Sequence, residues 1–101
     1  MSVEELTAIL IDSLKQVQEM CGRPTQELTE LDQPIGGLAG FDSLNGIEVT
    51  MLVATRLKCD IPGDVNLFVS EDGRRALTVK EIAGRMKKLL PTDGNRNNAR
   101  N

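Results

Sequence analysis

The first twenty residues carry apolar side chains at the spacing of an amphipathic helix. Ser2 and Glu5 form a Ser-x-x-Glu capping box, in which each side chain accepts a hydrogen bond from the other residue's backbone N–H. The apolar positions that follow are three or four residues apart, at Leu6, Ile9, Leu10, Leu14, Val17 and Cys21. Gly22 and Pro24 are typical of a helix end. The pattern predicts a first helix that begins at Ser2 and is closed by Gly22 and Pro24.

A second capping box, formed by Thr78 and Glu81, predicts the start of the last helix. Its apolar face consists of Val79, Ile82, Ala83, Met86 and the pair Leu89 and Leu90. Lys87 and Lys88 suit the negative end of the helix dipole, and Pro91 stops the helix.

The residues from Ser43 to Leu57 predict a central helix with two apolar stripes. At 100° per residue, one stripe contains Val49, Val53 and Leu57, and the other contains Leu44, Ile47, Met51 and Ala54. A helix needs only one stripe to join a core, so the second is either covered by a loop or exposed to a partner. Gly46 lies inside this helix, where glycine costs about 1 kcal/mol relative to alanine. We interpret it as a place where another backbone segment packs closely.

Two long connections join these helices. Residues 23–42 contain prolines and glycines that break regular structure, and their apolar side chains are expected to pin the connection across the bundle. These side chains are Leu28, Leu31, Ile35, Leu38 and Phe41. In residues 58–77, Ile61-Pro62-Gly63 predicts a turn, the apolar residues of 65–69 are compatible with one helical turn, and residues 70–75 predict an exposed loop.

The fold class predicted from these elements is all-α. We expect a small bundle of three main helices plus a short helix or turn, with a long first loop. Residues 1–90 would form this single domain, and residues 91–101 would be a disordered polar tail.

Composition excludes several classes of function. The chain has two Phe, no Tyr and no Trp, which predicts an aliphatic core and provides no aromatic platform for nucleic-acid bases. The net charge is −3, and residues 1–50 hold nine acidic residues against two basic ones, so we expect no nucleic-acid partner. No apolar run approaches the roughly 20 residues of a membrane span, and no charged-then-apolar leader opens the chain. We therefore expect a soluble cytoplasmic protein.

The sequence also offers little for catalysis or metal binding. It contains no His, the usual general base and the commonest metal ligand. Cys21 and Cys59 are isolated thiols without the paired spacing of zinc or redox sites, and we interpret both as core or helix-end residues in a reducing compartment. An enzyme using either thiol as a nucleophile would need a base to lower its pKa.

An Asp-Ser pair stands at the start of the central helix. Both residue types are favoured at helix N-caps. A hydroxyl at this position also lies where free N–H groups and the helix dipole favour a phosphate. Ser43 is therefore a candidate for carrying a phosphate ester, and the alternative is that Ser43 or Asp42 only caps the helix.

With these motifs in this order, the chain resembles the acyl carrier protein family, which includes peptidyl and aminoacyl carrier domains. The matching residues are Gly40-Phe41-Asp42-Ser43-Leu44, Ile61-Pro62, Leu67-Phe68 and Leu77-Thr78-Val79-x-Glu81-Ile82-Ala83. Together they cover the chain from about residue 3 to residue 90.

The resemblance implies a non-catalytic carrier, not an enzyme. Ser43 would be esterified by 4′-phosphopantetheine, transferred from coenzyme A by a separate magnesium-dependent phosphopantetheinyl transferase, and Asp42 would help to present the serine. The thiol of this arm would carry an acyl or aminoacyl group as a thioester, from a loading ligase to acyl-transferring enzymes of bacterial fatty-acid or specialised lipid biosynthesis. We expect a monomer that binds its partners through Leu44, Ile47, Glu48 and Met51.

The central helix departs from that of typical fatty-acid carriers, which is rich in acids. Glu48 is the only acid from Leu44 to Leu57, and Asn45, Ala54, Thr55 and Arg56 occupy positions where acids are common. Residues 63–77 also form a longer segment than usual. Both features suggest a specialised carrier with dedicated enzymes. The alternative hypothesis is an unmodified helical adaptor of the same fold that binds a partner through the second apolar stripe.

Overall fold

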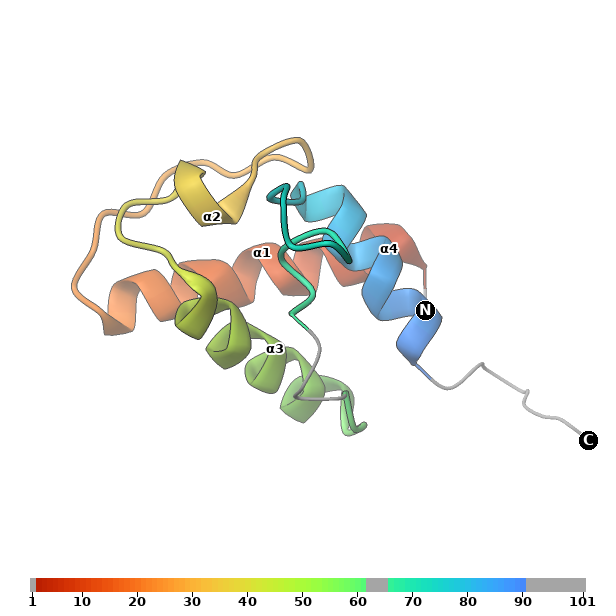
Figure 1. Ribbon diagram of the computed structural model, residues 1–101. Coiled ribbons are helices and arrows are strands. Elements are labelled where there is room, and N and C mark those ends of the chain that lie inside the picture. The colour runs from red at the N-terminus through yellow and green to blue at the C-terminus, as the bar shows by residue number, and fades with distance from the viewer. Residues whose placement is uncertain (1, 62–65, 91–101) are drawn as a thin grey trace, which may run out of the picture.

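Four helices form the regular structure of the described residues, 2–61 and 66–90, in a computed structural model. They are α1 (Val3–Met20), α2 (Pro34–Gly37), α3 (Ser43–Leu57) and α4 (Val79–Leu89). Helix α1 packs against both α3 and α4 (Figure 1). This part of the chain is an all-helical small bundle with no strand, as predicted. The Pro62-Gly63 part of the predicted turn and the predicted tail lie outside the described residues.

The capping boxes at the starts of α1 and α4 form as the sequence predicts. Ser2 Oγ accepts from the Glu5 N–H at 3.1 Å, and the Glu5 carboxylate accepts from the Ser2 N–H at 3.0 Å. Thr78 and Glu81 make the same reciprocal pair at the start of α4. Each box satisfies N–H groups that have no partner within the helix, which sets where α1 and α4 begin.

The core lies between α1, α3 and α4 and is closed by side chains from both connections. Its buried members are Leu6, Leu10, Leu14, Val17, Leu38, Phe41, Val49, Val53, Leu67, Phe68, Leu77, Val79, Ile82, Ala83 and Met86. The core is aliphatic apart from Phe41 and Phe68, whose ring centroids are 5.6 Å apart.

The first connection is pinned by most of its apolar residues. Leu38 and Phe41 are buried, and Leu28 and Ile35 pack against the core. Leu31 contradicts the prediction, because its side chain is 72 % exposed. It lies in a turn closed by the Asp32 N–H to the Thr29 carbonyl.

The backbone, rather than Leu31, holds this turn to the bundle. The carbonyls of Asp32 and Glu30 accept hydrogen bonds from the N–H groups of Val79 and Lys80, at 2.8 and 2.9 Å. The first N–H groups of α4 are therefore satisfied by the first connection.

The second connection contains a hairpin-like turn. The sequence of its apolar residues is compatible with one helical turn instead. In residues 66–77, Val69 and Ala76 form an antiparallel bridge, with hydrogen bonds from the Leu77 N–H to the Phe68 carbonyl and from the Ser70 N–H to the Arg75 carbonyl. Of the apolar residues in 65–69, Leu67 and Phe68 therefore lie in a turn and Val69 in a bridge rather than in a helical turn, and Val65 lies outside the described residues. Residues 71–75 are exposed, in agreement with the predicted loop.

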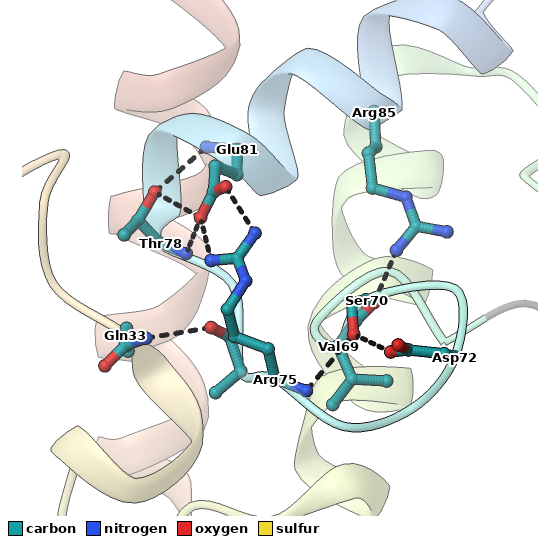
Figure 2. Close-up of polar contacts among 9 residues, drawn as sticks. Gln33, Val69, Ser70, Asp72, Arg75, Thr78, Glu81 and Arg85 are labelled. Carbon is teal, nitrogen blue, oxygen red and sulfur yellow. Dashed lines mark hydrogen bonds and ion pairs between the residues drawn. The ribbon is translucent and has the colours of Figure 1, made fainter.

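Side chains fasten this hairpin to its neighbours (Figure 2). Arg75 forms two hydrogen bonds with the carboxylate of Glu81, and Arg85 donates to the Val69 carbonyl. Gln33 donates to the Ala76 carbonyl at 2.8 Å, which links the two connections. The hairpin is thereby held against the start of α4.

Gly46 faces a side chain rather than the backbone segment predicted from the sequence. A Cβ at this position would lie 3.1 Å from Cδ1 of the buried Phe68 ring. That separation is shorter than ordinary carbon–carbon contact, so glycine allows the second connection to pack against α3.

No helix of the described ranges combines the length and the apolar character required to cross a lipid bilayer.

Candidate functional site

The structure separates the roles of the Asp-Ser pair at the start of α3. Asp42 has extended backbone and is the N-cap, because its Oδ1 accepts from the Asn45 N–H at 3.1 Å. Asn45 Oδ1 accepts from the Asp42 N–H at 3.3 Å and completes a capping box. Ser43 is the first helical residue, and both Asp42 and Ser43 are exposed. Of the two capping alternatives, the structure therefore selects Asp42.

The Ser43 hydroxyl makes no hydrogen bond with any part of the chain that the structure describes. The N–H groups of Ser43 and Leu44 likewise have no partner within residues 2–61 and 66–90. The start of α4 is different, because the Val79 and Lys80 N–H groups donate to carbonyls of the first connection. The start of α3 thus combines a free hydroxyl, free N–H groups and the positive end of a helix dipole.

A polar network that the sequence did not reveal lies beneath this turn. Asn45 is only 5 % exposed, and its Oδ1 also accepts from Arg23 Nη1 at 2.8 Å. Asn45 Nδ2 donates to Glu48 Oε1 at 2.7 Å. The same Arg23 nitrogen donates to Gln18 Oε1 at 3.2 Å, and Gln18 Nε2 donates to the Ala39 carbonyl at 2.8 Å. The network therefore connects the end of α1 with the residues on both sides of Ser43.

Gly40 is required by this arrangement for two reasons. Its φ is +67°, a left-handed conformation that favours glycine. A Cβ on Gly40 would also lie 2.8 Å from Nε of Arg23, so the backbone before Asp42 can lie over the guanidinium only without a side chain.

The second apolar stripe of α3 is exposed. Leu44, Ile47 and Met51 are 66 %, 41 % and 64 % exposed, whereas Val49 and Val53 on the opposite face are fully buried. Glu48 is exposed beside the stripe, with one carboxylate oxygen held by Asn45. The four residues predicted to bind partners therefore lie at the surface of α3, beginning one residue after Ser43. Whether they bind a partner remains a prediction.

The basic residue near the other end of the stripe is paired within the protein. Arg56 forms an ion pair with Asp12 of α1 at 2.5 Å. The hydrogen bond from Arg56, followed by one from Gln16, holds the pKa of Asp12 below its ordinary value. This pair, together with the contact between Asn45 and Cys21, shows that α1 and α3 run antiparallel. Arg56 is therefore directed towards α1.

Neither thiol lies in the core. Cys21 is exposed at the C-cap of α1, and Cys59 is partly buried just after α3, so the helix-end interpretation is correct and the core interpretation is not. Burial, and secondarily the Asp60 carboxylate, raises the pKa of the Cys59 thiol, which lowers the fraction of reactive thiolate. Within the described residues, no group of three Cys, Asp or Glu side chains is arranged to hold a metal ion.

Comparison of the chain with models of protein families, with curated proteins and with solved structures finds no match. The resemblance to acyl carrier proteins therefore rests on the sequence motifs alone.

Proposed function

We propose that this protein is a specialised acyl or aminoacyl carrier with an acyl-carrier-like fold, whose phosphopantetheine arm is attached to Ser43. The observation that carries the proposal is the state of the Ser43 hydroxyl, which is exposed and unbonded within the described residues while Asp42 caps the helix. A serine used for capping would have its oxygen occupied. This hydroxyl is available to a phosphoryl donor brought by another protein.

The surroundings of Ser43 fit a phosphodiester. The N–H groups of Ser43 and Leu44 point out of the first turn of α3, where they and the helix dipole favour negative charge. Asp42 uses Oδ1 for capping, and its other carboxylate oxygen has no hydrogen bond in residues 2–61 and 66–90, so it is free to contact a transferase. When bound, the arm would supply a thiol that carries the cargo as a thioester.

The face next to Ser43 favours dedicated partner enzymes. Leu44, Ile47 and Met51 present apolar surface, Glu48 is the only acid of α3, and the charge of Arg56 is paired with Asp12. A charge that is already paired attracts an oppositely charged partner less strongly. Recognition would therefore depend mainly on apolar contact.

The mass of the intact protein tests the proposal. Incubation with a phosphopantetheinyl transferase, magnesium and coenzyme A should add one phosphopantetheine to the wild type and none to Ser43→Ala. Thr55→Ala is the matched control, because it removes another exposed α3 hydroxyl and should be modified like the wild type. Modification of Ser43→Ala would place the attachment site elsewhere.

An unmodified adaptor is the second candidate, and the exposed stripe on α3 is the observation that favours it. In that case the wild type would gain no mass under conditions in which a known carrier is fully modified. Partner binding would then be equal for the wild type and Ser43→Ala, and weakened by Met51→Glu.

A further inference from the structure

The amide of Asn45 bridges two opposite charges beneath the proposed attachment site. Its oxygen accepts from the Arg23 guanidinium, and its nitrogen donates to the Glu48 carboxylate. The reversed amide would place an NH₂ group against the cation and an oxygen against the anion. The two charges therefore fix the orientation of Asn45, and this orientation gives the Asp42 N–H its acceptor.

Arg23 connects this bridge to the end of α1. It lies just beyond the C-cap of α1 and donates to Gln18, which is itself 1 % exposed and holds the Ala39 carbonyl. Its guanidinium also lies against the backbone of Gly40. One side chain thus contacts the segment before Asp42 and the first turn of α3.

The segment between α2 and α3 has few other fastenings. In residues 38–42, the Phe41 N–H donates to the Leu38 carbonyl, and the side chains of Leu38 and Phe41 are buried. Between Phe41 and Ser43, the backbone is held by the Asp42–Asn45 capping box and by the Gly46 N–H, which donates to the Asp42 carbonyl. Arg23 shares the Asn45 oxygen of that box.

We infer that Arg23 is a positioning residue for Ser43. By tying Gln18 and Asn45 together under Gly40, it holds the Asp42–Ser43 turn so that the hydroxyl is presented to an incoming transferase. The inference rests on the proposed function. It goes beyond that function by assigning the geometry of the site to a residue twenty positions earlier in the chain, outside the recognised motifs.

The test compares Arg23→Met with Arg74→Met. Both replace a cation by an unbranched apolar side chain, but the Arg74 side chain is exposed and has no partner in the described residues. For Arg23→Met, we expect kcat of phosphopantetheine transfer to fall by about 10- to 100-fold, because small errors in placement of a reacting group have effects of that size. KM for the carrier should change less than about two-fold, because the α3 face is retained. Arg74→Met should behave like the wild type.

Hydrogen exchange measures the turn independently of the reaction. In Arg23→Met, the Asp42 and Asn45 N–H groups should exchange about ten-fold faster, whereas the Ile82 N–H in α4 should not change. Equal acceleration at all three positions would indicate general destabilisation and would overturn the inference.

A charge swap tests the bridge itself. Asn45→Asp places a second carboxylate beside Glu48 and should lower kcat, whereas adding Glu48→Gln restores a donor–acceptor pair at the original net charge. We expect the double variant to recover to within about three-fold of the wild type. A double variant no better than Asn45→Asp would overturn the inference.

The outcomes separate this inference from the proposed function. A wild type that accepts no phosphopantetheine refutes the proposed function and, with it, any role of Arg23 towards the reaction. A modified wild type together with an unchanged kcat in Arg23→Met refutes the positioning role alone, even if exchange becomes faster.

Discussion

Replacing Asp42 and Ser43 one at a time should separate the residue that stabilises α3 from the residue that is modified. Asp42→Ala removes the oxygen that accepts from the Asn45 N–H, and loss of such a cap costs about 1 kcal/mol. In a domain of this size, that loss lowers the melting temperature by about 4–8 °C. Ser43→Ala removes a hydroxyl that has no partner in the described residues, so the free energy of unfolding should change by less than about 0.5 kcal/mol.

Thermal and urea unfolding followed by circular dichroism, combined with intact mass, gives both readouts. Asp42→Asn is the matched control, because asparagine caps helices about as well as aspartate but carries no charge. It should keep the stability of the wild type. If the free carboxylate oxygen of Asp42 contacts the transferase, Asp42→Asn should also be modified more slowly.

The opposite pattern would refute this division of roles. A loss of about 1 kcal/mol in Ser43→Ala with no loss in Asp42→Ala would mean that the serine oxygen caps α3. The hydroxyl would then not be free in the folded protein, and the main support for the proposed attachment site would be removed.

Three further predictions concern packing, partner binding and pH. Gly46→Ala should lower the free energy of unfolding by about 1 kcal/mol, since the crowded contact with the buried Phe68 ring outweighs the gain in helix propensity; a more stable variant in urea unfolding would contradict the packing argument. Met51→Glu should weaken binding to the partner enzyme by at least about ten-fold and leave the melting temperature unchanged, and binding of the wild type should depend only weakly on salt; a strong salt dependence in calorimetric titration would show that charge pairs dominate. Hydrogen bonds from Arg75 and then from the Thr78 N–H lower the pKa of Glu81 from 4.5 to about 2, so its stabilising contribution is complete above about pH 4.5 and is lost as the pH falls towards 2; melting curves of Glu81→Gln should depend less on pH in that window.

The sequence was most informative where local chemistry decides the structure. The boxes at Ser2 and Thr78 act within four residues of chain, and α1 and α4 begin where they predict. The two stripes of α3 were also predictable, because helical spacing alone places Leu44 and Val49 on different faces. Whether the second stripe would be exposed or covered by a loop was not predictable, since that depends on the path of the connections.

Features that depend on tertiary approach were missed. Asn45 is not the usual partner in a capping box, so its pairing with Asp42 gave no recognisable motif. The position of Arg23 beneath Gly40 follows only from the path of the first connection. Short apolar runs such as residues 67–69 are compatible with either a helical turn or a strand-like pairing. In this chain, the hydrogen bonds that close the turn of residues 70–75 favour the pairing.

The hydrogen bonds from the first N–H groups of α4 to Glu30 and Asp32 couple two distant parts of the chain. The order of the first connection depends on a helix almost fifty positions later, so the two should open and close as one cooperative unit. Fraying of α4 from its start would release these carbonyls and loosen residues 29–32. A truncated chain that lacks α4 would therefore lose structure well upstream of the cut.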